Sequence, residues 1–147
     1  MANKEIRRAL QVALGYNSPT YALWPVTTGV PATGVQLDSG AAAWGAYVDI
    51  IAAAAITTEF WLMAAIVDTA IPAIAVFGLH EVEIYNLTTT TTVYQFRVDN
   101  TADNVNTTPF PIPIPVWCSP NDQIQGRTGA LDTANKINCS LLVATGL

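Results

Sequence analysis

Apolar and polar residues alternate with a period of two in several segments of this chain, which is the pattern of β-strands that bury one face. The clearest case lies near the C-terminus, where the alternate apolar positions are Ile137, Cys139, Leu141 and Val143. Asn138 and Ser140 lie between them, and similar alternation surrounds Val82 and Phe96. These segments are therefore expected to be half-buried strands of a two-layered structure.

Alternation and the turn residues between the apolar segments together predict nine strands. The expected strands are 21–28, 33–37, 46–52, 57–67, 73–85, 92–98, 108–117, 123–128 and 136–144. Gly, Pro, Asn and Asp occupy most of the breaks, and the five threonines of 88–92 favour the edge of a hairpin. Short strands at this regular spacing predict an all-β sandwich or barrel.

The first residues follow a helical period instead. Asn3 can cap a helix whose apolar stripe is Ile6, Leu10, Ala13 and Leu14, and Gly15 can end it. Three turns are marginally stable alone, so this helix has to pack on its own domain or on a partner. The sequence thus predicts a short N-terminal α-helix or arm over 1–18 and a β-sandwich domain over 19–147.

The segment 60–67 is apolar on both faces of the expected strand. Phe60, Leu62, Ala64 and Ile66 are expected to fill the core, which leaves Trp61, Met63, Ala65 and Val67 facing outward. An apolar outer face needs a cover, either the N-terminal helix or a loop of the same chain, or a second subunit. On the second interpretation, the subunit interface contains Trp61, Met63 and Val67.

Four prolines alternate with aliphatic and aromatic residues in one strand, at positions 109, 111, 113 and 115. Alternate residues of a strand direct their N–H groups to the same side, and proline has no N–H. This strand can therefore pair fully on one side only, which predicts a place at the edge of a sheet. The same feature blocks unwanted edge-to-edge pairing.

The amino-acid composition indicates where such a sandwich is found, in a membrane or in a protein assembly. Charged residues make up 12% of the 147 residues, about half of the roughly 25% that is usual, and the mean hydropathy is +0.34. Either a membrane or an assembly would suit this surface. The charge-free runs between Asp49, Glu59 and Asp68 are nine and eight residues long, whereas a spanning helix needs about 18 or more. No signal peptide is expected either, so the assembly is favoured.

The net charge of −5 is unevenly distributed along the chain. Residues 1–8 carry Lys4, Arg7 and Arg8 against Glu5, a net charge of +2, and the remaining three basic and ten acidic residues give −7. A nucleic-acid binder would be basic over its body, so nucleic acid is not an expected partner. The basic start is either a solvated helix end or an arm that docks on an acidic neighbour through Lys4, Arg7 and Arg8.

The chain has few residues of the types that usually carry catalysis. His80 is its only histidine and favours a surface or interface position, and Cys118 and Cys139 are expected to be small, partly buried thiols, although a disulfide between them is possible. The polar loop 99–106 could ligate calcium, but its spacing differs from an EF-hand and its residues are standard turn formers. We expect no catalytic residue, no metal site and no cofactor.

Residues 111–127 read Pro-Ile-Pro-Ile-Pro-Val-Trp-Cys-Ser-Pro-Asn-Asp-Gln-Ile-Gln-Gly-Arg, and residues 137–143 read Ile-Asn-Cys-Ser-Leu-Leu-Val. An aliphatic strand, a polar turn, a strand with an Ile-x-x-Arg core, a Gly-rich loop and a last strand follow one another here. This succession resembles small virion proteins of tailed bacteriophages, over about residues 45–147. The resemblance implies a jelly-roll-like antiparallel β-sandwich that decorates the outside of a capsid, commonly as a trimer or dimer.

These features together predict a structural virion protein, a capsid decoration (cement) protein that bridges shell subunits in a virion assembled in the host cytoplasm. Its partners would be the major capsid protein or another virion protein and further copies of itself, with no membrane. One alternative is the receptor- or glycan-binding head of a phage fibre, with a groove containing Trp24, Trp44 or Trp117. The other is a filament or sheath subunit. An enzyme is not expected.

Overall fold

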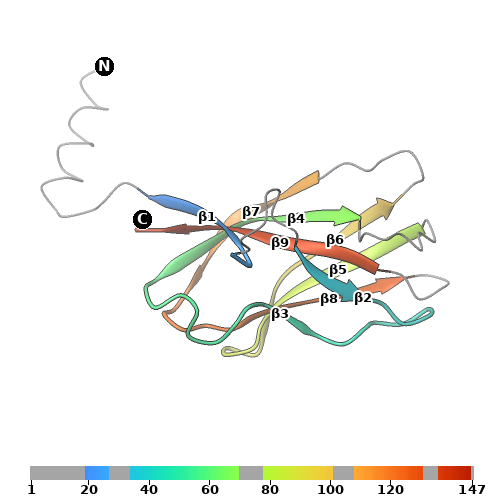
Figure 1. Ribbon diagram of the computed structural model, residues 1–147, viewed down its shortest axis with the longest axis horizontal. Coiled ribbons are helices and arrows are strands. Elements are labelled where there is room, and N and C mark those ends of the chain that lie inside the picture. Colours follow the sequence, from blue (N-terminus) through green and yellow to red (C-terminus); the bar gives the residue numbers. More distant parts are fainter. Residues whose placement is uncertain (1–18, 27–33, 70–77, 101–107, 131–135, 147) are drawn as a thin grey trace, which may run out of the picture.

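The computed structural model describes residues 19–26, 34–69, 78–100, 108–130 and 136–146, and these form two antiparallel sheets that face each other as layers (Figure 1). The strands are β1 (Thr20–Trp24), β2 (Val35–Asp38), β3 (Val48–Ile51), β4 (Phe60–Thr69), β5 (Gly78–Asn86), β6 (Thr91–Asn100), β7 (Thr108–Cys118), β8 (Ile124–Ala130) and β9 (Lys136–Thr145). Each corresponds to one of the nine strands predicted from the sequence. The helix expected over 1–18 lies outside the described residues.

The order of the strands defines a jelly roll. The first sheet has the order β1-β9-β4-β7, and β2 continues the pairing of β1 along β9. The second sheet has the order β3-β8-β5-β6. If β1 and β2 are taken as two halves of one strand, the chain passes between the sheets as it does in a double Greek key. The predicted fold class, an all-β jelly-roll-like antiparallel sandwich, is confirmed.

The edge position predicted for the proline-spaced strand is also confirmed, because β7 ends the first sheet and, among the described strands, pairs with β4 alone. The two strands are out of register in the middle, since Leu62 pairs with Val116 but Ala64 pairs with Pro111. Four residues of β7, 112–115, therefore stand opposite Met63 alone. Ile114 in this bulge is exposed, whereas Ile112 reaches the core.

Because of this bulge, the second half of β4 is oriented differently from the prediction. A bulge changes which face the following residues occupy, and Met63 lies at that position. Phe60 and Leu62 point inward and Trp61 points outward, as predicted. Beyond Met63 the prediction is wrong: Ala65 and Val67 lie in the core, and Val67 is 5% exposed. Ala64 and Ile66 share the outer face, because they pair with Leu142 and Ser140 of β9.

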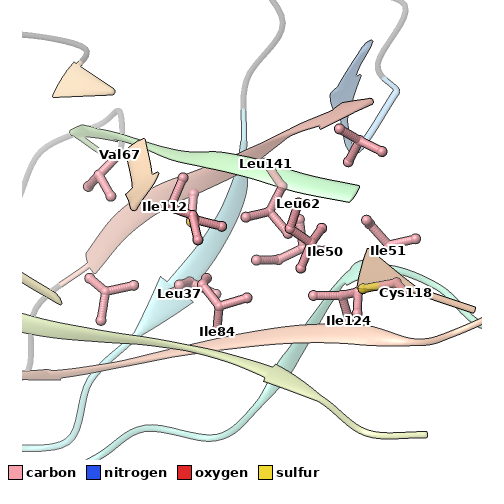
Figure 2. Close-up of a cluster of buried hydrophobic side chains, with 14 of the residues drawn as sticks. Leu37, Ile50, Ile51, Leu62, Val67, Ile84, Ile112, Cys118, Ile124 and Leu141 are labelled. Carbon is pink, nitrogen blue, oxygen red and sulfur yellow. The ribbon is translucent and has the colours of Figure 1, made fainter. Parts of the chain in front are cut away.

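The core lies between the two sheets and is mostly aliphatic (Figure 2). Leu62 and Leu141 from the first sheet face Ile84 and Ile124 from the second. Cys118 and Cys139 are both free and buried, and burial raises the pKa of each thiol to about 12. Neither cysteine is therefore a nucleophile at neutral pH, which fits the expectation of small buried thiols.

Candidate functional site

The outer face of the first sheet carries a row of apolar side chains across all four neighbouring strands. Tyr21 of β1 pairs with Ala144 of β9, Ala144 pairs with Trp61 of β4, and Trp61 pairs with Trp117 of β7. Paired residues of antiparallel strands share a face, so these side chains stand side by side. Tyr21 and Trp117 are 55% and 52% exposed.

A second apolar row runs beside the first. Leu23 of β1 pairs with Leu142 of β9, and Leu142 pairs with Ala64 of β4. We call the two rows together the apolar sheet face, which consists of Tyr21, Leu23, Trp61, Ala64, Trp117, Leu142 and Ala144. This surface holds no charged side chain. Tyr21, Leu23 and Trp117 are exposed, whereas Ala64 and Ala144 are buried. Exposed apolar side chains gathered in this way typically mark a site of protein–protein contact.

The same sheet becomes polar toward β2. Gln36, Asp38, Lys136 and Asn138 share the outer face there, because β2 and β9 pair in that register. Lys136 and Asp38 form an ion pair at 3.7 Å, between Nζ and Oδ2. Within this one sheet, the apolar side chains therefore lie at the end of β9 that pairs with β1, and the polar side chains lie at the end that pairs with β2.

The interface residues predicted from the sequence coincide in part with this surface. Trp61 faces outward and is half-buried, and Met63 is half-buried at the bulge. Val67, predicted for the same interface, packs in the core instead, because the bulge changes the face on which it lies. The predicted docking residues Lys4, Arg7 and Arg8 lie outside the described residues. Sequence reasoning did not place Tyr21 and Trp117 beside Trp61, since that depends on the register of strands far apart in the chain.

The outer face of the second sheet has the opposite character and is organised around Glu83 of β5. The Glu83 carboxylate accepts hydrogen bonds from Thr92 Oγ1 at 2.6 Å, from Arg127 Nε at 2.5 Å and from Tyr47 Oη at 3.2 Å. Burial by itself would raise the pKa of Glu83. The hydrogen bonds from Thr92 and Arg127, with the charge of Arg127, outweigh it and hold the pKa below its ordinary value.

Aromatic rings hold Arg127 in place above this sheet. Its guanidinium carbon lies 4.6 Å from the centre of the Trp44 ring and 4.4 Å from that of Tyr47, within cation–π range. Tyr47 in turn packs on Tyr85, with ring centres 4.9 Å apart. The segment that carries Trp44 and Tyr47 is thereby fixed beside β8, with Trp44 in a β-bridge to Gly129, and a pocket lies beside Trp44.

His80 lies inside the sandwich, so the expected surface position is wrong. It is fully buried on the inner face of β5, beside the Thr128 hydroxyl at 3.5 Å from Nδ1. Burial lowers the pKa of His80 because the charged imidazolium loses its hydration. This position leaves the imidazole without access to any substrate.

We expect this buried imidazole to make the protein less stable in mild acid. The unfolded chain binds a proton on His80 as the pH falls below about 6.5, whereas the folded chain binds it only at lower pH. The free energy of unfolding should then fall by up to about 1.4 kcal/mol per pH unit below that value. Denaturant titrations between about pH 7 and pH 5 measure the slope. It should disappear in His80→Gln; an unchanged slope in that variant would assign the effect to another group.

Metal and membrane features are missing from the described part of the chain. No group of three or more His, Cys, Asp or Glu side chains that could hold a metal ion occurs among these residues. The loop 99–106, considered above for calcium, lies largely outside them. None of the described segments forms a helix able to span a membrane.

No protein-family model matches this chain, and no curated protein sequence matches it. Among solved structures it is similar to VP2 of infectious bursal disease virus in a subviral particle, with 20% identity over 89% of this chain and a TM-score of 0.47. It is also similar to a mutant VP2 of the same virus in T=1 particles, with 19% identity, 89% coverage and a TM-score of 0.45. The chain spans about a third of the length of these VP2 chains, 33% and 32%.

Proposed function

We propose that this chain is a structural virion protein that decorates a capsid and stabilises it by bridging shell subunits. The apolar sheet face carries the proposal, because it is an uncharged surface with two exposed aromatic side chains on a folded jelly roll. Jelly rolls recur in viral capsid domains. The low overall charge of the chain is then explained, since partners cover part of its surface.

The occupant of the apolar sheet face in this proposal is a second copy of the chain, in a dimer or trimer. Two arguments support a copy. The face extends across the sheet from β1 to β7, and Tyr21 and Trp117 on these edge strands remain exposed while Trp61 between them is half-buried. An apolar surface on one copy is also present on every other, so it can be self-complementary in a symmetric oligomer.

The basic arm is assigned to the contact with the shell. Lys4, Arg7 and Arg8 give residues 1–8 a net positive charge, while the rest of the chain is acidic. An arm of this sign is attracted to an acidic surface of the major capsid protein or another virion protein. The arm and the apolar sheet face then serve two different contacts, one with the shell and one between copies.

The proposed function can be tested by measuring whether purified virus particles contain the chain. Virions isolated on a density gradient from cells that express this sequence should contain the chain in many copies, detected with an antibody to the folded sandwich. Deletion of residues 1–15 should lower the occupancy of the particles while leaving the oligomer intact. Recovery of the full chain only in the fractions without particles would contradict the proposal, and unchanged occupancy after the deletion would remove the arm from it.

A further inference from the structure

A pocket of about 260 Å³ opens on the outer face of the second sheet, on the opposite side of the sandwich from the apolar sheet face. Its walls include Ala42, Trp44, Leu79, Glu81, Arg97 and Gly129. The pairing of the strands brings these residues together, because Glu81 of β5 stands between Arg97 of β6 and Gly129 of β8. Trp44 reaches the same place through a β-bridge with Gly129.

Contacts within the chain hold the indole of Trp44 in place without a ligand. A Cβ at position 129 would lie 3.3 Å from the ring, so the glycine allows Trp44 to lie against the backbone of β8. The Gly45 amide donates to the Thr128 carbonyl at 2.9 Å, and Arg127 packs on the ring. Trp44 still exposes 36% of its surface. A pocket wall held in this way loses little freedom when a ligand binds.

Glu81 and Arg97 form the polar wall and retain unused hydrogen-bonding capacity. Glu81 Oε1 accepts from Gln95 Nε2 at 2.9 Å and lies 3.9 Å from Arg97 Nε. Within the part of the chain that the structure describes, Glu81 Oε2 and the terminal amino groups of Arg97 make no hydrogen bond or ion pair. The Arg97 side chain is 69% exposed. Both an acceptor and several donors therefore face the opening.

The charges of this wall select the class of ligand. An anion would meet Glu81, and a cation would meet Arg97, so neither gains from the pair as a whole. A hydroxyl group, in contrast, carries one donor and two acceptor lone pairs. Neighbouring hydroxyls on a ring can donate to the Glu81 carboxylate and accept from the Arg97 guanidinium at once. The C–H groups of the same ring can pack on Trp44 and Leu79, which are both exposed.

We propose that this pocket binds an uncharged sugar ring, with Trp44 and Leu79 contacting its apolar side and Glu81 and Arg97 binding its hydroxyls. Pocket volume limits the ligand to about one ring, because sites for larger ligands measure roughly 300–1,000 Å³. The site does not rest on the assembly role, since it lies on the other sheet. In an oligomer joined through the apolar sheet face, the pockets of all copies remain accessible, so weak binding to a polymeric glycan would be strengthened by multivalency.

Ligand-observed NMR on the full chain tests the proposal, with the methyl glycosides of glucose, galactose and mannose as neutral probes and N-acetylneuraminic acid as the anionic one. At least one neutral glycoside should bind with a millimolar dissociation constant. Arg97→Ala should weaken binding about tenfold or more, because bonds to a charged partner are lost. Trp44→Ala should also weaken it, while Trp117→Ala, which removes an exposed tryptophan of the other sheet, should leave it unchanged.

Three outcomes would overturn the proposal. They are the absence of binding to every neutral glycoside, tighter binding of the anionic sugar than of the neutral ones, and equal binding by wild type and Arg97→Ala. Arg97 is largely exposed and makes one long ion pair, so its replacement leaves the fold in place. The mass of the protein in solution should not change in either pocket variant, which separates this result from any failure of the assembly role.

Discussion

Val67→Asp is expected to prevent the protein from folding, whereas the same substitution one residue earlier, Ile66→Asp, should be tolerated. Val67 is 5% exposed and packs in the core between the sheets. A carboxylate at this position would be buried without a partner, which costs more than about 4 kcal/mol. A domain of this size is stable by only about 5–15 kcal/mol, so such a loss removes most of its stability.

Ile66 provides the matched control because the bulge places it on the outer face of the sheet. Its half-buried side chain stands beside Ser140, and an aspartate there can reach water. We expect Ile66→Asp to lower the free energy of unfolding by no more than about 2 kcal/mol. Circular dichroism and denaturant titration of the two variants measure the difference. The reverse order of stability would mean that uninterrupted alternation continues through β4 and that the bulge at Met63 is absent.

The second large effect is expected on the apolar sheet face. Trp117→Asp should weaken self-association at least about 30-fold, because a tryptophan buried on association is often a hot spot that contributes about 2 kcal/mol or more. Trp61→Asp should act in the same direction. Trp117 lies on the edge strand and is 52% exposed, so its replacement leaves the fold intact and affects only the contact between copies.

Leu87→Asp is the control for this experiment. Leu87 is also an exposed apolar residue, 40% accessible, but it lies in the turn between β5 and β6 and outside the apolar sheet face. Sedimentation of the three variants and the wild type over a range of concentrations measures the dissociation constant. If Trp117→Asp and Trp61→Asp both keep the wild-type mass, a second copy does not cover this face. If Leu87→Asp also dissociates, the loss of mass reflects added charge and not a specific surface.

The strands and the edge position of β7 could be predicted from the sequence because both are local properties. Alternation reports which residues of one strand share a face, and the prolines at 109, 111, 113 and 115 remove hydrogen-bond donors wherever the strand lies. The turn residues Leu87–Thr90 between β5 and β6 are local in the same sense. For such features no knowledge of the partner strand is needed.

The orientation of Val67 and the composition of both outer faces could not be predicted in this way. Val67 lies in the core because Met63 is an extra residue of β4 opposite β9, and β7 is also out of register there; only the pairing of β4 with these strands reveals this. Trp61 and Trp117 become neighbours through the same pairing. Arg127 and Glu83 meet because β5 and β8 are adjacent, although they are 44 positions apart in the chain. Contacts of this kind depend on register between distant segments.

A cryo-electron microscopy map of the native assembly would show what covers each sheet of the sandwich. We expect Tyr21, Trp61 and Trp117 of one copy to be buried against a neighbouring copy, while the Trp44 pocket on the other sheet stays open to solvent. A map in which the apolar sheet face is exposed to solvent, or is covered by a segment of the same chain, would contradict this expectation.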